Sequence, residues 1–463
     1  MAIFPCVEID ICLLSNSEIV FGGGGRRRCE RLARKLVSMR TTSMDRRSEA
    51  FMAGAVICTV AAGVIVVLAV ASSTPVYADE REHLEIATNL ANGAGYSLDG
   101  SATAYRPPTG PLILAAATAV HVRAQYIGMI PALCLVIAAL LGAWIVGHRL
   151  GMLAGAAVVL YPLNVYTAAT LYPRALATAI LLALWLVASR SADGIPAAMS
   201  RRACVVSGLL TAAFALAVPT MIFSAVVVVL WTRWHQPGRR NRIGSAVFAW
   251  SVRNATVIGS PVAFSTGSGL NPLRGNNENA TATLGVAAHI GSYVQGAEGV
   301  GEVEADDYFR GSAVEWITTH PSGAAVRYGQ KVLNYFSPYN RPATAGRGGG
   351  LESAGVWASF AVTVALLCVR VLLRRRAPIL PSERLFLVLF VANAPIKAVF
   401  FARTRFRQPL ENNLIVEAAV AVAVLIPAFT RGRRERVSAD GGVEAEAATV
   451  PTSAVFESWS DRS

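Results

Sequence analysis

Apolar residues in this chain gather in blocks that are long enough to cross a membrane. A transmembrane helix needs about 20 consecutive, predominantly apolar residues, and blocks of roughly that size alternate with short polar segments through most of the sequence. They are residues 51–74, 126–146, 153–171, 176–188, 205–231, 243–258, 354–373, 385–401 and 414–429. The pattern predicts an all-α polytopic membrane protein in which residues 51–430 form a helical bundle.

The composition supports this prediction and excludes several other classes. Hydrophobic residues make up 54% of the 463 residues and charged residues only 15%, whereas a soluble domain carries about a quarter charged residues. The net charge of +13 comes mainly from arginines in short runs between the apolar blocks, not from one basic surface. We therefore expect no nucleic-acid partner. The richness in arginine and alanine is typical of a bacterial protein.

The basic runs predict the topology, because cytoplasmic loops of membrane proteins hold an excess of lysine and arginine. These runs lie within residues 1–50, at 201–202, within 233–242, at 374–376 and within 431–436. Placing all of them inside predicts about ten spans in the bacterial inner membrane, with both termini cytoplasmic. Residues 75–125 and 259–353 are then outside, and the block 205–231 must be a hairpin broken at Pro219.

The two ends of the chain differ from the membrane domain in composition. Residues 1–50 combine a glycine run with basic residues and lack the apolar core of a secretory signal. Residues 431–463 turn acidic and rich in serine after the last basic run. Both segments are predicted to be disordered cytoplasmic tails.

The first outer segment, residues 75–125, begins with two adjacent carboxylates. Asp79 and Glu80 precede a stretch in which apolar residues recur at helical spacing on one face, which predicts a helix lying in the membrane interface. Asn92-Gly93 marks its end. The carboxylates at its start have two interpretations, an acidic helix cap that interacts with the helix dipole or a catalytic pair at the depth of the lipid head groups.

A proline-rich turn follows in the same segment. Arg106-Pro107-Pro108-Thr109-Gly110-Pro111 leads into residues 112–120, an apolar run too short to span. The order of Asp-Glu, amphipathic helix and Arg-Pro-Pro turn resembles the first outer loop of GT-C membrane glycosyltransferases. The most similar branch is family 39, which includes protein O-mannosyltransferases and the lipid A aminoarabinose transferase.

Later motifs continue the resemblance, in order, over roughly residues 50–430. They are Trp250-Ser251-Val252-Arg253-Asn254, Ser265-Thr266, Gly269-Leu270-Asn271, Gly275-Asn276-Asn277, the segment 313–321 followed by Lys331, and Arg403-Thr404-Arg405-Phe406-Arg407-Gln408-Pro409. Each motif alone is weak, whereas the ordered set is fairly specific for the family. It carries no information about the sugar.

The resemblance implies a function and a set of site residues. The family transfers a sugar from a polyprenyl-phosphate donor to an acceptor, which is a protein, a lipid or a cell-wall glycan, on the extracytoplasmic face. The matched positions make Asp79 the general base and give Glu80 the role of orienting the acceptor or the base. Arg106, Pro107 and Pro108 would belong to the substrate loop.

Other matched residues have two interpretations each. Arg403, Arg405 and Arg407 either bind the phosphate of the donor or extend towards lipid head groups. Arg253 either shares the phosphate or caps its own helix together with Asn254. Asn276 and Asn277 bind sugar hydroxyls or are turn residues after Gly275, and the turn is the commoner use of asparagine. The acidic residues of the large outer loop are expected to be solvated surface charges. They are Glu302, Glu304, Asp306, Asp307 and Glu315.

The sequence departs from the family at two places. Relatives carry a second carboxylate at the outer end of the third span, where this chain has Thr170-Leu171-Tyr172-Pro173-Arg174, and they carry Arg-Pro-Thr where it has Val218-Pro219-Thr220. No pair of cysteines has the spacing of a metal site either. The sequence therefore supports no divalent metal and no other cofactor.

Two other functions stay open at the level of the sequence. A transporter or flippase of lipid-linked sugars would concentrate ionisable residues inside its spans, whereas this sequence places them in the predicted outer loops. A non-catalytic relative that binds a lipid-linked sugar is the other alternative, because the second carboxylate is missing.

Overall fold

The computed structural model describes most of the predicted membrane domain. The described residues are 75, 77–122, 124–146, 151–192, 201–235, 243–338, 350–375, 378–401, 403–422 and 425. The predicted tails, 1–50 and 431–463, and the first apolar block, 51–74, lie outside them. The described chain is mostly α-helical, which confirms the all-α prediction.

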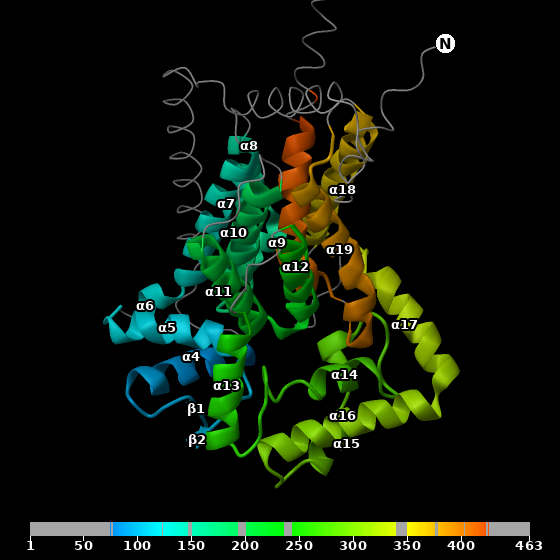
Figure 1. Cartoon of the computed structure of the whole chain (residues 1–463). Coiled ribbons are helices and arrows are strands. Elements are labelled where there is room, and N and C mark those ends of the chain that lie inside the picture. The colour runs from blue at the N-terminus through cyan, green and yellow to red at the C-terminus, as the bar shows by residue number, and fades with distance from the viewer. Residues whose placement is uncertain are drawn as a thin grey trace, which may run out of the picture.

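The upper layer in Figure 1 is a bundle of steep apolar helices. One continuous apolar core joins them, in which Trp185 stacks on Phe386 with ring centroids 4.9 Å apart. The members are α7 (Ile130–Val146), α8 (Gly151–Leu160), α9 (Pro162–Ala168), α10 (Arg174–Ala192), α11 (Arg201–Ala217), η1 (Pro219–Met221), α12 (Ile222–His235), α18 (Gly350–Leu372), η3 (Leu373–Arg375), α19 (Pro381–Val399) and a further helix at 404–422.

The lower layer comes mainly from the two segments that the sequence predicts outside, 75–125 and 259–353 (Figure 1). Its elements are α4 (Ala78–Ala91), β1 (Ser97–Leu98), β2 (Ser101–Ala102), α5 (Thr109–Ala119), α6 (Ala124–Ile127), α13 (Ile243–Val257), α14 (Leu270–Gly275), η2 (Gly285–Ala287), α15 (Gly291–Gly296), α16 (Glu302–Thr319) and α17 (Pro321–Tyr335). The two short strands pair antiparallel, Ser97 opposite Ala102. Helix α13, predicted as a span, packs against α11 of the bundle.

One described helix, Ser353–Arg375, is long and apolar enough to cross a membrane. The pair Gly151–Leu160 and Pro162–Ala168, bent by 61°, would be a second if it forms one broken span. Several other predicted blocks contain apolar helices of 10–17 residues. The count of about ten spans therefore stays a prediction.

The break in the block 205–231 is confirmed. Helix α11 ends at Ala217, and a turn of 3₁₀-helix at Pro219–Met221 leads into α12. Pro219 occupies the first position of that turn, where its missing N–H costs no hydrogen bond and its fixed φ suits a helix start. The sequence signal, a proline within an apolar block, thus locates the bend.

The helix predicted after Asp79 is also present, but its apolar face has a different partner. Leu84, Ala87 and Leu90 of α4 pack in a small apolar cluster with Leu114 of α5. The short apolar run that could not span therefore covers α4, instead of the membrane surface that the sequence predicts. Helix α4 ends at Asn92 as expected, followed by Gly93 with φ 82°, a left-handed conformation that glycine adopts freely.

Ionisable residues do lie inside the bundle, which corrects the expectation that they gather in the outer loops. Arg370 of α18 donates to Glu383 of α19 at 2.6 Å, and both are almost fully buried. Arg407 and Glu411, one turn apart on the helix 404–422, form a second buried ion pair. Such charges are retained in an apolar interior when they are paired or hydrogen-bonded, as Lys397 of α19 is to Thr220, because each alone would lose its hydration. The pair Arg370–Glu383 joins two helices, so no local spacing reveals it, whereas the spacing of four residues between Arg407 and Glu411 was available in the sequence.

Removing one partner of the pair Arg370–Glu383 is expected to destabilise the protein strongly. Glu383→Leu leaves a buried guanidinium without this carboxylate and removes the acceptor of the Leu380 N–H at 3.0 Å. We expect a loss of about 3–5 kcal/mol in the free energy of unfolding, measured in detergent. The control Asp307→Ala breaks an exposed pair with Arg310 and should cost at most about 1 kcal/mol. Equal stabilities of the two variants would contradict the assignment.

Candidate active site

A cavity of about 1190 Å³ lies where the lower layer meets the bundle. Its wall combines two kinds of surface. The charged side chains that line it are Asp79, Glu82, Arg106, Arg174, Arg274, Arg403 and Arg405, and apolar side chains from the bundle include Leu160, Leu163, Val165, Ile222, Val356 and Ile396. A ligand that fills this cavity would meet five guanidinium groups, two carboxylates and a wall of hydrocarbon.

The two adjacent carboxylates of α4 have separate tasks. Glu80 is 3% exposed, and its two carboxylate oxygens accept the N–H groups of Tyr77 and Leu171, each at 2.8 Å. It therefore caps α4 and attaches it to the segment after α9. Asp79 instead lines the cavity, and Glu80 is not among the described lining residues. The sequence left open whether these carboxylates cap the helix or form a catalytic pair. In the structure Glu80 is the cap, and Asp79 is the carboxylate that reaches the cavity.

Arg106 holds Asp79 in place. Its guanidinium donates to Asp79 Oδ1 at 2.7 Å and also to the carboxylate of Glu82, one turn further along α4. Burial would raise the pKa of Asp79, but the charges of Arg106 and Arg405 outweigh it and lower that pKa. For Glu82, burial outweighs Arg106 and raises the pKa. Asp79 is thus an ionised carboxylate at neutral pH.

The proline turn places Arg106 at the cavity. Tyr96 donates its hydroxyl to the carbonyl of Arg106 at 2.8 Å, and the guanidinium lies 4.8 Å from the centre of the Tyr105 ring. Pro107 lines the cavity, whereas Pro108 precedes the first residue of α5 and is not among the lining residues. Of the predicted substrate loop, Arg106 and Pro107 reach the cavity.

Arg405 and Arg174 form a pair of like charges that also lines the cavity. Both guanidinium groups lie over the rings of Phe406, at 5.1 and 4.6 Å, and of Tyr172, each at 5.9 Å. Arg174 also donates to the backbone carbonyl of Arg405. Neither forms an ion pair with a carboxylate of the part of the chain that the structure describes. The cavity lining thus has more guanidinium groups than carboxylates, an excess that favours the binding of an anion.

Arg403 and Arg274 extend the same basic wall. Arg403 donates to the carbonyls of Thr283 and Leu284 at 2.7 and 3.0 Å, which leaves its side chain at the edge of the cavity. The Nε atoms of Arg274 and Arg405 are buried, and no described group accepts a hydrogen bond from either. These donors fit a ligand with several acceptor oxygens, such as a phosphate.

Arg407 is placed away from this wall, contrary to the expectation that all three late arginines meet the donor. It is 1% exposed, forms the ion pair with Glu411 and donates to the carbonyl of Tyr335. On the helix that starts after Arg403, positions 405 and 407 point to different sides, because residues two apart do not share a face. The two interpretations weighed for Arg407, phosphate binding and contact with head groups, are both replaced by a structural role.

Arg253 joins α13 to the first outer segment instead of reaching the cavity. It donates to the carbonyls of Thr103 and Tyr96 at 2.7 and 3.0 Å, and to the side chain of Asn254 at 3.0 Å. Its guanidinium also lies 5.2 Å from the centre of the Trp250 ring. The Trp-x-x-Arg-Asn motif therefore works as a clamp between two segments of the lower layer.

Asn276 and Asn277 are turn residues, which is the commoner use of asparagine after a glycine. Asn276 donates to the carbonyls of Pro272 and Val399 at 2.9 and 3.0 Å. Asn277 donates to the carbonyl of Leu273 at 2.7 Å and is fully buried. Neither is among the described residues that line the cavity.

Glu82, Arg174, Arg274 and His83 line the cavity but are absent from the sequence prediction. Glu82 lies three residues after Asp79, a helical spacing that places both on one face and was available in the sequence. Arg174 is the first residue of α10. His83 is buried and its pKa is lowered to about 4, mainly by burial and further by Arg106, so the imidazole stays neutral at neutral pH.

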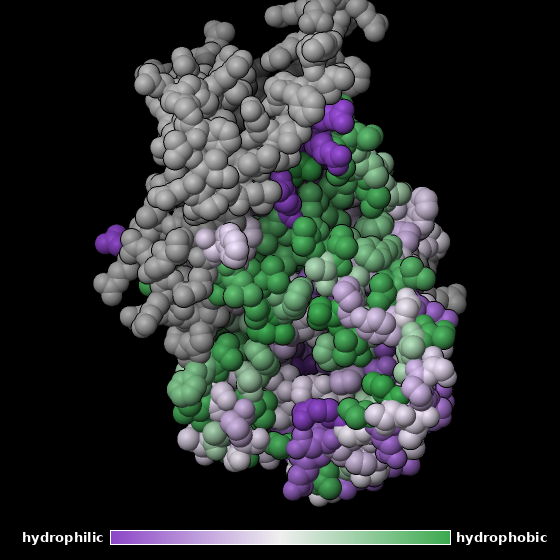
Figure 2. Space-filling model, turned by 45° about the vertical axis from the view of Figure 1, so that its right-hand side comes forward, coloured by the Kyte–Doolittle hydropathy of each residue, from purple (hydrophilic) through white to green (hydrophobic). Residues whose placement is uncertain are grey.

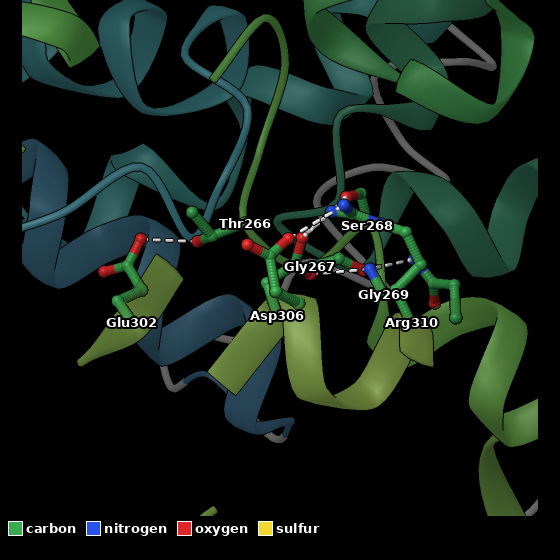
Figure 3. Close-up of polar contacts among 9 residues, drawn as sticks. Thr266, Gly267, Ser268, Gly269, Glu302, Asp306 and Arg310 are labelled. Atoms are coloured by element: carbon green, nitrogen blue, oxygen red, sulfur yellow. Dashed lines mark hydrogen bonds and ion pairs between the residues drawn. The ribbon is translucent and has the colours of Figure 1, made fainter. Parts of the chain in front are cut away.

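Two acidic residues of α16 hold one wall of the cavity, whereas the sequence predicts solvated charges there. Figure 3 shows Glu302 and Asp306 directed at residues 266–269. Glu302 accepts from the hydroxyls of Thr103, at 2.7 Å, and Thr266, and Asp306 accepts from Ser268 at 2.8 Å and from the N–H of Gly269 at 2.5 Å. Because Ser265, Gly267 and Ser268 line the cavity, α16 fixes the shape of that wall.

No group of three or more histidine, cysteine, aspartate or glutamate side chains in the described ranges is arranged to hold a metal ion. The carboxylates of Asp79 and Glu82 are bridged by the guanidinium of Arg106. A ligand would therefore meet Asp79 with one oxygen engaged by Arg106 and the carboxylate 38% exposed to the cavity.

A methyl group at Gly269 is expected to separate α16 from this wall. A Cβ there would lie 2.0 Å from the carbonyl oxygen of Asp306 and 2.9 Å from the nitrogen of Arg310, both backbone atoms. Gly269→Ala should cost about 1–3 kcal/mol, as overpacking does. The control Gly311→Ala, in α16 with nothing within 4 Å, should be neutral or stabilising by about 0.5–1 kcal/mol. Thermal unfolding in detergent measures both, and an unchanged Gly269→Ala would contradict the close packing.

Comparisons with protein-family models, curated proteins and solved structures find no match to this chain. The function of the chain is therefore inferred from the residues that line the cavity and from the motifs that hold them there.

Proposed function

We propose that the chain is an integral membrane glycosyltransferase of the GT-C type that uses a polyprenyl-phosphate sugar as donor. The observation that carries this proposal is the meeting of three separate motifs in one cavity. Asp79 and Arg106 come from the first outer segment, Ser265 and its neighbours from the second, and Arg405 from the last. A basic wall next to a hydrocarbon wall suits a lipid phosphate, because the phosphate can bind the arginines while the polyprenyl chain contacts the apolar side chains.

The surface of the bundle supports a location in the membrane. In Figure 2, hydrophobic side chains gather over the upper helices, and most of the hydrophilic ones lie at the lower end. Only 17% of the apolar window in Ser353–Arg375 is buried, whereas the core helix of a soluble protein is mostly buried. Leu133 and Trp144 of α7 and Val362 of α18 are 59–65% exposed. Apolar surface of this extent is typical of contact with lipid.

The reaction assigns a role to each wall of the cavity. The acceptor hydroxyl oxygen attacks the anomeric carbon of the sugar, and the bond between that carbon and the phosphate oxygen breaks. Asp79 takes the hydroxyl proton on one carboxylate oxygen, while Arg106 holds the other oxygen in place. Arg405 and Arg174 meet the negative charge that develops on the departing phosphate. One displacement inverts the anomeric centre, and the product lipid phosphate stays on the basic wall until it leaves.

A direct transfer assay tests the proposal. Purified chain is given a panel of labelled polyprenyl-phosphate sugars and a lipid extract of a bacterial envelope, and transfer of the label is expected. Absence of transfer by folded protein across the panel would contradict it.

The runner-up function is a transporter or flippase of lipid-linked sugars. The buried ion pairs of the bundle, Arg370–Glu383 and Arg407–Glu411, favour it, because ionisable residues inside spans often mark transport pathways. Counter-flow of donor in proteoliposomes without covalent transfer would support it. A non-catalytic protein of this type, which the absence of a second carboxylate in the segment 170–174 suggests, would bind donor and consume none.

Asp79→Asn is expected to lower turnover by about 10²-fold or more, because asparagine keeps the shape of the side chain but takes no proton. Donor affinity should change far less, since the hydrogen bonds to the phosphate come from the arginines and not from Asp79. The rate of transfer and the donor Kd measure the two effects. The same substitution at exposed Asp307 is the control and should leave both unchanged. Full turnover in Asp79→Asn would exclude it as the base.

Arg405→Ala is expected to weaken donor binding by roughly 10–100-fold, the equivalent of one or two charge-assisted hydrogen bonds of about 1.5–3 kcal/mol. The Kd of a polyprenyl phosphate, measured in detergent, gives the effect. Arg81 lies on the exposed side of α4 outside the cavity, so Arg81→Ala is the matched control. If both variants bind equally well, Arg405 does not hold the phosphate.

The pH dependence of turnover should follow the lowered pKa of Asp79. Asp79 works as base only when ionised, so the acid limb of the pH–rate profile lies below the ordinary pKa of an aspartate. Arg106→Gln removes a charge that lowers this pKa, and the acid limb should move to higher pH. The stability contributed by the Asp79–Arg106 pair is likewise present at neutral pH and lost as pH falls through the lowered pKa. An acid limb that stays in place would contradict the coupling.

A further inference from the structure

Helix α17 (Pro321–Tyr335) has its polar and apolar sides reversed relative to a helix on a water-exposed surface. Its two cationic residues point into the protein. Lys331 is 1% exposed and donates to the carbonyl of Phe400 at 2.9 Å and to the side chain of Asn276 at 3.0 Å. Arg327 donates to the carbonyl of Asn277 and lies 4.2 Å from the centre of the Trp316 ring.

The outward side of α17 carries no charged residue, and the one exposed amide side chain there is that of Gln330. Leu333 is 74% exposed, Val326 62% and Phe336, directly after the helix, 38%. Ala325 and Gly329, also exposed, complete a stripe with Leu333 at intervals of four residues. A helix on the surface of a soluble protein shows the opposite arrangement, with charges outward and apolar residues inward. This face is therefore suited to an apolar neighbour.

The position of α17 along the bundle identifies that neighbour. Tyr335 donates its hydroxyl to the carbonyl of Phe390, and Tyr328 to that of Pro395, at 2.9 and 3.1 Å. Since a helix rises 1.5 Å per residue, Phe390 lies about 14 Å along α19 from its end at Val399. The last two turns of α17 thus run beside the lower half of α19, a bundle helix that exposes Val391 at 58%. Figure 1 shows α17 continuing from this contact towards α16.

We propose that the second half of α17 lies within the outer leaflet and that its stripe contacts lipid acyl chains. The inference rests on the membrane location proposed above. It changes the topology of the segment 259–353, which then dips into the membrane instead of forming a fully aqueous loop. Phe400, whose carbonyl Lys331 holds, lines the cavity. Contact of α17 with lipid therefore sets the depth of the cavity at the level where the phosphate of a lipid donor lies.

Site-directed fluorescence on the full chain tests this placement. Leu333→Cys is introduced into a variant whose native cysteines are replaced, labelled with an environment-sensitive dye and reconstituted in phosphatidylcholine vesicles. Two matched positions serve as references, Glu315→Cys on the exposed side of α16 and Val362→Cys on α18. Quenching is measured with doxyl groups attached to the lipid chains and with aqueous iodide. We expect the Leu333 label to lose emission to the lipid quencher as the Val362 label does, and the Glu315 label to respond to iodide.

The outcomes separate this inference from the proposed function. A Leu333 label quenched by iodide, beside a lipid-quenched Val362 label, would overturn the placement of α17 and leave the membrane location standing. Protection of the Leu333 label from both quenchers would overturn it as well, because the stripe would then be covered by protein. A Val362 label that the lipid quencher does not reach would remove the membrane location and both proposals with it.

Discussion

Every buried charge in this structure needs a partner, because most of the side chains that surround it are apolar. This requirement decides how the helices of the bundle and the lower layer are joined. Loss of hydration costs an isolated ion far more than a single contact returns, so the bundle keeps its charges as pairs such as Arg370–Glu383. The same rule directs Lys331 to backbone carbonyls. At the cavity the charges do not balance, since five guanidinium groups and only two carboxylates of the described residues line it. That imbalance is the physical basis for expecting an anionic ligand.

The cavity brings together a charged surface and an apolar one. Its two carboxylates, Arg106 and Arg274 come from the lower layer, whereas Arg174, Arg405 and the hydrocarbon wall come from the bundle. Each polar element is fixed from behind: Arg106 by Asp79, Glu82 and the Tyr96 hydroxyl, and the segment 265–271 by α16. In the proposed reaction, such support would hold Asp79 and Arg106 in position before the ligand arrives, and electrostatic catalysis depends on groups that are positioned in advance. A lipid-facing α17 would add the membrane itself to this support.

Much of the local structure followed from the order of residues. The start and end of α4, the short helix after the prolines and the break at Pro219 are set by neighbours in the chain, through caps, turns and proline geometry. About half of the site residues that the motifs predict line the cavity. Asp79, Arg106, Pro107, Arg403 and Arg405 stand in motifs and reach the cavity. Arg253, Arg407 and Asn276 stand in equally good motifs and hold other segments together, a difference that no spacing reveals.

The sequence by itself determined the helical class, the apolar blocks, the position of the turns and the presence of a carboxylate at the start of α4. These depend on periodicity, propensity and nearest neighbours. Only the tertiary structure decided that Glu80 caps while Asp79 faces the cavity, that α5 and not the membrane covers α4, and that Arg174 joins Arg405. It also revealed the reversed faces of α17. These features depend on which side chains from distant segments share a buried space. The free energy of burying a charge is set by those neighbouring side chains and not by the position of the residue in the chain.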